Sequence, residues 1–132
     1  MDNIQSYTGH IGIPVQDVET SVNFYQKLGF DILERHQLDS GNGGKNHIAF
    51  ATKNGVLLEF YQLHGETTSK REGAINHVAI KVENLGEVQN LLGELDIPLV
   101  DGPTSLPFGQ NGMTYMMIEG PDRERIEFDE FH

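Results

Sequence analysis

Residues 9–15 read GHIGIPV and residues 76–82 read NHVAIKV, two versions of one pattern that decides how this chain should fold. The two stretches align without a gap, and the same offset carries Asp17 onto Asn84. Farther along, LEF at 58–60 corresponds to IEF at 126–128, one position beyond that offset. Self-similarity at a fixed spacing indicates a chain built from repeated structural units. The sequence therefore predicts two related modules.

The first module reads as a strand, a helix and three further strands. Alternating apolar residues predict a strand at 8–15, and Asp17 stands where the N-cap of a helix belongs. Apolar residues then recur at helical spacing, and Gly29 is a typical helix stop. The Asn54-Gly55 pair predicts a hairpin turn. The three later strands are expected at 30–37, 47–52 and 56–62.

The second module repeats this order. A strand is expected at 74–82, followed by a helix capped by Asn84, with Glu87 three positions later as in a capping box. Residues 102–109 are expected to form a long loop that borders a pocket. Short strands are expected near 97–100, 113–119 and 125–131.

These elements predict an α+β fold of two tandem βαβββ modules, whose curved mixed sheets surround a cavity. One domain is expected to span residues 1–132, with module 1 at about 7–64, a polar linker at about 65–73 and module 2 at about 74–132. A chain of 132 residues is long enough for two small modules that share a core.

Composition narrows the partners and the compartment. Nine Lys and Arg against twenty Asp and Glu give a net charge of −11, which repels phosphate backbones and anionic lipid surfaces. No apolar run approaches the roughly 20 residues that span a bilayer. We therefore expect no nucleic acid partner and no membrane partner. The chain has no cysteine and no basic-apolar signal at its N-terminus, so a cytoplasmic location is expected.

Two histidines and two glutamates recur at matching places of the repeat. His10 corresponds to His77, and Glu59 corresponds to Glu127. Strand alternation places each of them opposite the apolar residues that should pack under the helix. Imidazole nitrogens and carboxylate oxygens together suit borderline divalent ions such as Zn²⁺, Ni²⁺, Co²⁺, Mn²⁺ or Fe²⁺. The pattern predicts one such ion, held by all four residues.

The alternative is that these are ordinary strand residues. A histidine or glutamate in an amphipathic strand usually faces solvent or forms a hydrogen bond. The recurrence of both residues in both modules favours the metal site, but the pattern alone leaves the two interpretations open.

Three motifs resemble the vicinal oxygen chelate superfamily. HIGIPVQD at 10–17 and NFYQKLGF at 23–30 resemble the opening strand and helix of that superfamily. Gly120-Pro121-Asp122 followed by IEF at 126–128 resembles its closing hairpin. The superfamily includes glyoxalase I, methylmalonyl-CoA epimerase, extradiol dioxygenases, fosfomycin-modifying enzymes and bleomycin-resistance proteins. The resemblance covers essentially the whole chain.

Glyoxalase I is the member whose ligand set is most similar. The resemblance implies that His10, Glu59, His77 and Glu127 are metal ligands, that Glu127 is the catalytic base, and that Glu59 is a ligand and second base. It further implies a metal-dependent lyase or isomerase that converts a small α-oxygenated carbonyl substrate through an enediolate. Because each open sheet exposes an edge, a homodimer is also expected, and the metal site could be completed within one chain or across two.

Two departures concern the thiol carrier. Small glyoxalase I enzymes of this kind have an arginine where this chain has Pro14, and an asparagine where it has Leu63. Both residues help to hold glutathione there, so a different carrier, or none, is expected here. The alternatives are an epimerase of the methylmalonyl-CoA type, an extradiol dioxygenase, and a non-catalytic drug or metabolite binder of the bleomycin-resistance type.

Overall fold

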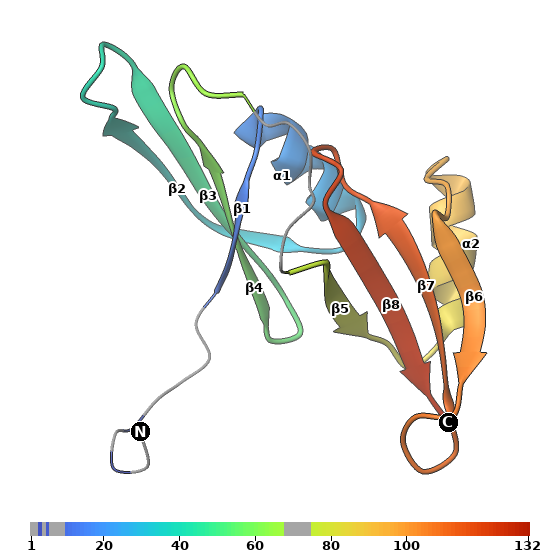
Figure 1. The fold of residues 1–132 in the computed structure, drawn as a ribbon. Helices are drawn as coiled ribbons and strands as arrows, with labels where there is room; N and C mark the ends of the chain where they lie inside the picture. Colours follow the sequence, from blue (N-terminus) through green and yellow to red (C-terminus); the bar gives the residue numbers. More distant parts are fainter. Residues whose placement is uncertain (1–2, 4, 6–9, 68–74) are drawn as a thin grey trace. The chain divides into compact units, whose positions relative to one another are not determined.

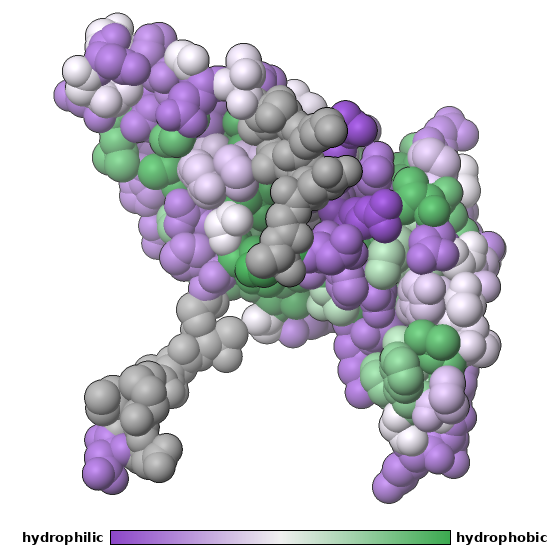
Figure 2. All heavy atoms as spheres, in the orientation of Figure 1, coloured by the Kyte–Doolittle hydropathy of each residue, from purple (hydrophilic) through white to green (hydrophobic). Residues whose placement is uncertain are grey.

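The chain forms two compact units, Met1–Thr68 and Ser69–His132 (Figure 1). The structure is a computed structural model that describes Asn3, Gln5 and residues 10–67 and 75–132. On the face shown in Figure 2, hydrophilic residues cover most of the visible surface, in keeping with the net charge of −11. Within the described ranges, no helix has both the length and the apolar character needed to cross a membrane.

Unit 1 has the expected β-α-β-β-β order. Its sheet has the order β1-β4-β3-β2, in which β1 runs parallel to β4 and the other neighbours are antiparallel. The parallel pair follows from the helical crossover between β1 and β2, which allows β1 to lie beside β4. The elements are β1 (Ile11–Pro14), α1 (Val18–Lys27), β2 (Asp31–Asp39), β3 (Lys45–Lys53) and β4 (Val56–Gln62).

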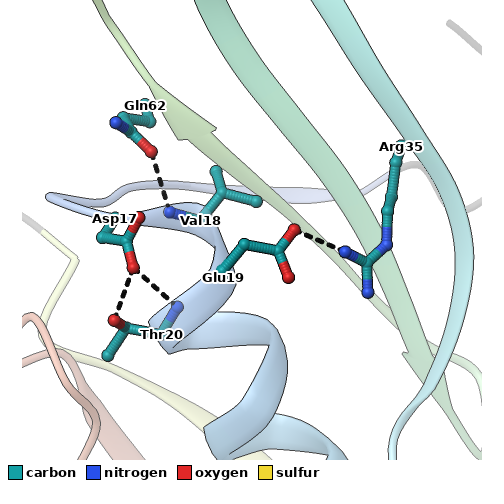
Figure 3. A network of polar contacts seen from close by, with 6 residues as sticks. All are labelled: Asp17, Val18, Glu19, Thr20, Arg35 and Gln62. Atoms are coloured by element: carbon teal, nitrogen blue, oxygen red, sulfur yellow. Dashed lines mark hydrogen bonds and ion pairs between the residues drawn. The ribbon is translucent and has the colours of Figure 1, made fainter.

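The N-terminus of α1 is held by the predicted cap. The Asp17 carboxylate accepts hydrogen bonds from the backbone N–H of Thr20 at 3.0 Å and from its hydroxyl at 2.6 Å (Figure 3). The side-chain oxygen of Gln62 accepts from the N–H of Val18 at 2.9 Å, which joins the helix to the end of β4. Two of the N–H groups that a helix start leaves without intrahelical partners are thus satisfied.

Two predicted turn signals are confirmed in unit 1. Gly29 has φ +85° directly after α1, and it is followed by a hydrogen bond from Phe30 N–H to the Tyr25 carbonyl at 3.0 Å. This is the Schellman arrangement that closes many helices. Asn54 and Gly55 have φ +49° and +87°, the two positive values that a type I′ hairpin turn requires.

The core of unit 1 lies between α1 and the apolar face of the sheet. Leu58 and Phe60 of β4 are fully buried, as are Val22 and Tyr25 of α1. The rings of Tyr25 and Phe60 lie with their centroids 4.7 Å apart. Because side chains alternate along a strand, burial of these two β4 residues turns Glu59 to the opposite face.

Unit 2 repeats this arrangement. Its sheet has the order β5-β8-β7-β6, with β5 parallel to β8. The capping oxygen of Asn84 accepts from Glu87 N–H at 3.1 Å, which confirms the second predicted cap. The elements are β5 (His77–Lys81), α2 (Leu85–Glu94), β6 (Asp101–Leu106), β7 (Met113–Glu119) and β8 (Arg125–Phe131). The prediction of an α+β fold built from tandem βαβββ modules is confirmed.

One strand prediction was wrong. Residues 97–100 are not a strand, because Ile97 N–H bonds to the Leu92 carbonyl at 2.9 Å and so completes the Schellman closure of α2. The strand runs instead from Asp101 to Leu106, so most of the stretch at 102–109 that was expected to be a loop is also a strand. It contains Pro103, which cannot donate to a ladder. β6 tolerates this residue because it is an edge strand with a register shift between Asp101 and Thr104.

Candidate functional site

The first His–Glu pair joins His10 and Glu59 in unit 1. Nε2 of His10 lies 2.9 Å from Oε2 of Glu59, and the two side chains are 45% and 22% exposed. His10 directly precedes β1, and Glu59 lies on β4 in register with Gly12. The edge of the His10 ring also packs on Phe50, with the ring centroids 5.7 Å apart.

The second His–Glu pair joins His77 and Glu127 in unit 2. Nε2 of His77 lies 3.1 Å from Oε2 of Glu127, and the side chains are 36% and 12% exposed. His77 begins β5, and Glu127 lies on β8 in register with Ala79. The amide oxygen of Asn76 lies 3.0 Å from Nδ1 of His77. A proton on Nδ1 would donate to that oxygen and leave the Nε2 lone pair facing Glu127.

The two pairs are equivalent in backbone geometry. In each unit the histidine stands two residues before the small residue, Gly12 or Ala79, that is in register with the glutamate. The parallel pairing of the first strand with the last strand of the module therefore brings the imidazole over the carboxylate in the same way. The sequence predicted that all four residues hold one ion, and the structure joins His10 to Glu59 in unit 1 and His77 to Glu127 in unit 2.

The donor atoms of each pair suit a divalent metal ion. Two ligand atoms at right angles, each about 2.1 Å from an ion, lie about 3.0 Å apart. The observed 2.9 and 3.1 Å are compatible with that spacing, as they are with an ordinary ion pair. Within the described residues, no group of three or more His, Cys, Asp or Glu side chains lies together as a metal site. Each unit on its own therefore supplies two such donors.

Glu127 is the more deeply buried of the two glutamates, and its environment changes its acidity. Burial raises the pKa of Glu127 above its ordinary value, because water no longer stabilises the charge. The nearby His77 opposes this shift, whereas the carboxylates of Asp129 and Asp101 raise the pKa of Glu127 further. The carboxyl group of Glu127 is thus a stronger base than an exposed glutamate.

The sequence predicts only part of the acidic surroundings of Glu127. Asp129 shares the face of Glu127 by strand alternation, and that signal was visible. Asp101 lies opposite Met117 at the start of β6, and Met117 in turn lies opposite Glu127. The misplaced boundary of β6 therefore hid this carboxylate.

The fold and the paired side chains together define a protein with a duplicated βαβββ module and an equivalent His–Glu pair between the first and last strands of each copy. The family model described as "Glyoxalase/Bleomycin resistance protein/Dioxygenase superfamily" matches residues 8–128. The chain belongs to this superfamily.

Individual relatives agree with this assignment. The chain is 30% identical over 122 residues to the "uncharacterized protein YwbC" of Bacillus subtilis, covering 90% of this chain and 93% of that protein. Its fold is similar to a glyoxalase family protein from Enterococcus faecalis, with a TM-score of 0.77, 23% identity, and coverage of 94% and 97% of the two chains. It is also similar to the trypanothione-dependent glyoxalase I of Leishmania major, with a TM-score of 0.73, 24% identity, and coverage of 92% and 84%.

Proposed function

We propose that this protein is a metal-dependent lyase or isomerase of the glyoxalase I type, acting on a small α-oxygenated carbonyl compound. The observation that carries the proposal is the recurrence of one His–Glu pair in both units, at 2.9 and 3.1 Å. Ordinary surface contacts have no reason to recur at equivalent positions of two modules whose sequences have diverged. A shared functional requirement explains the recurrence.

In this proposal His10, Glu59, His77 and Glu127 hold one divalent ion, which is Zn²⁺, Ni²⁺, Co²⁺, Mn²⁺ or Fe²⁺. The two pairs meet around it either within one chain or across a homodimer. When bound, the ion supplies Lewis acidity, which makes the C–H next to a carbonyl easier to deprotonate. The paired donors fit such an ion by atom type and by spacing.

Glu127 is the proposed general base. In the metal-free protein burial raises the pKa of Glu127, so its carboxylate is a stronger base than an exposed glutamate. The carboxylate takes the proton from the substrate carbon and returns it to the adjacent carbon. Glu59 is 22% exposed at its side chain, and we assign it the role of ligand and second base.

The thiol carrier is proposed to differ from glutathione. Pro14 lies on β1, in register with Tyr61, and it offers no charged group to an anionic carrier. Leu63 follows β4 and is 37% exposed, so no side-chain amide is available at that position either. We therefore propose another carrier, or none.

The assembly is proposed to be a homodimer in the cytoplasm. β2 is an edge strand of nine residues that is paired on one side by β3, and β6 is the edge strand beyond β7 in unit 2. Unpaired edges of this length favour association with another chain. The absence of cysteine agrees with a reducing compartment.

An activity screen tests the function. Purified protein is supplied with each of the five ions and assayed with methylglyoxal hemithioacetals of several thiols and with CoA esters. Turnover of a hemithioacetal is the expected result, and Glu127→Gln should lower kcat at least about a hundredfold without loss of the fold. The exposed Glu119→Gln on the same sheet is the control and should keep full activity. Full activity of Glu127→Gln would remove the proposed base.

A further inference from the structure

We infer that Asp129 determines substrate specificity, by binding a cationic hydrogen-bond donor such as an ammonium group on the substrate. This inference rests on the proposed function, because it assumes that the substrate is held beside the second His–Glu pair. It adds the chemical class of the group that the substrate must carry.

Asp129 lies on the same face of β8 as Glu127, two residues farther along the strand. Two residues of a β-strand span about 6.7 Å, so the Asp129 carboxylate lies one substrate length from a ligand atom of the second His–Glu pair. Its neighbours in register are Lys81 on β5 and Tyr115 on β7. A molecule held at Glu127 can therefore extend along β8 and reach Asp129.

One oxygen of Asp129 has an unmet requirement for a donor. The residue is 9% exposed, and among the described residues no hydrogen-bond donor reaches Oδ1. A buried carboxylate oxygen without a partner is unfavourable, because it has lost water and gained nothing in return. A buried oxygen without a partner in a folded protein calls for an explanation, and one explanation is a ligand that supplies the hydrogen-bond donor.

The neighbouring donors are engaged elsewhere. The Tyr115 hydroxyl donates to Asp101 at 3.2 Å. The Lys81 ammonium lies over the ring of Phe131, 4.5 Å from its centroid. Neither group is directed to Oδ1 of Asp129, so the part of the chain that the structure describes leaves this oxygen without a donor.

The charge of this face favours a cation. Asp101, Glu127 and Asp129 lie close together on this sheet, because Met117 is in register with both Asp101 and Glu127, and Asp129 lies two residues farther along β8 on the same face. The opposing cations that β5 and β8 place on the same face are Lys81 and Arg125, both at exposed positions. A concentration of carboxylates raises the local concentration of positively charged ligands and disfavours anionic ones.

Access is compatible with this role. Ala79, which is in register with Glu127, is exposed, so the β5 side of the face is open to solvent. Lys81 is long and exposed, and its contact with Phe131 is of a type that is weak at exposed sites. The Lys81 side chain can therefore leave Phe131 when a ligand enters.

Calorimetric binding of three hydroxamates to the full chain loaded with Zn²⁺ tests the inference. Hydroxamates chelate a metal through two neighbouring oxygens, as the proposed substrate would. β-Alanine hydroxamate, butyrohydroxamate and succinic monohydroxamate have equal chain lengths and end in ammonium, methyl and carboxylate. We expect the ammonium probe to bind about tenfold more tightly than the methyl probe, and the carboxylate probe more weakly than both.

The isosteric Asp129→Asn variant should abolish this order while leaving the affinity for butyrohydroxamate unchanged. Asp101→Asn is the matched control, because that carboxylate already has a partner in Tyr115, and it should keep most of the preference. Metal-dependent binding without a charge preference, or an equal loss for all three probes in Asp129→Asn, would overturn this inference alone. Binding that does not depend on the metal, or no binding of any probe, would overturn the proposed chelating site and this inference with it.

Discussion

Replacing Asp96 by glycine should stabilise the protein, because the two units close their helices with different residues in the same backbone conformation. In unit 1 the residue after the C-cap is Gly29, with φ +85°. In unit 2 the equivalent residue is Asp96, with φ +55° and a hydrogen bond of 3.2 Å to the Gly93 carbonyl. A residue with a Cβ is strained in this left-handed region, and glycine is not.

Two opposing effects set the size of the gain. Relief of the left-handed conformation is worth about 1–2 kcal/mol for an ordinary residue and less for aspartate. The greater freedom of glycine in the unfolded chain returns about 0.4–1 kcal/mol of this. Removing a negative charge from the C-terminal end of α2, which has no basic residue in its last turn, adds about 0.3 kcal/mol. The net expectation is a gain of about 0.5–1 kcal/mol.

Urea denaturation followed by circular dichroism measures this gain. The midpoint should rise in Asp96→Gly while the slope stays the same, since the exposed surface does not change. Asp96→Asn is the control, because it removes the charge and keeps the Cβ, and it should give only the charge contribution of about 0.3 kcal/mol. A lower midpoint for Asp96→Gly, or equal midpoints for the two variants, would show that the backbone conformation of this residue is not the source of strain.

Three further changes have defined outcomes. Asp17→Ala should cost about 1 kcal/mol of folding stability and Asp17→Asn much less, since asparagine is an equally good cap. Hydrogen bonds from Thr20 lower the pKa of Asp17, so the stabilisation by Asp17 is complete above the ordinary aspartate pKa and fades as the pH falls through the lowered value. An acid titration of the stability of both variants measures this loss. The raised pKa of Glu127 acts in the opposite sense: the metal-free protein should lose stability as the pH rises from the ordinary glutamate pKa through the raised value, and Glu127→Gln should remove that loss in denaturation curves at pH 4 and pH 7. Phe60→Ala, at a fully buried position, should cost about 3–5 kcal/mol of folding stability, whereas Leu57→Ala on the other face of β4 should cost distinctly less. Urea midpoints measure both losses, and equal losses would contradict the assignment of the two faces.

Much of the fold follows from local signals in the sequence. The caps Asp17 and Asn84 and the Asn54-Gly55 turn act through their own backbone neighbours, so their positions fix element ends directly. The repeat of a strand and a helix at one offset then predicts the topology, because the apolar faces of both modules must pack in the same way. These predictions needed no knowledge of distant contacts.

The predictions that failed depend on distant contacts. Ile97 and its neighbours have the composition of a strand, but the closure of α2 uses the Ile97 N–H, and β7 pairs with residues farther along. Pro103 argues against a strand unless the strand is known to lie at an edge. An edge position is a property of the assembled sheet.

The candidate site divides in the same way. The choice of His10, Glu59, His77 and Glu127, and the sheet faces they share, followed from the repeat and from strand alternation, whereas the pairs that they form come from the structure. The raised pKa of Glu127 did not, because it arises from burial and from Asp101, a residue brought close by the sheet alone. Identity and face are local properties, whereas acidity is set by the whole environment.

Metal content per chain tests the central proposal most directly. Elemental analysis of the purified protein and of His10→Ala and His77→Ala should find one divalent ion per chain in the parent and almost none in either variant, since both His–Glu pairs are proposed to hold the same ion. Two ions per chain, or full retention of the ion after either pair is broken, would show that the pairs act separately and would contradict the shared metal site.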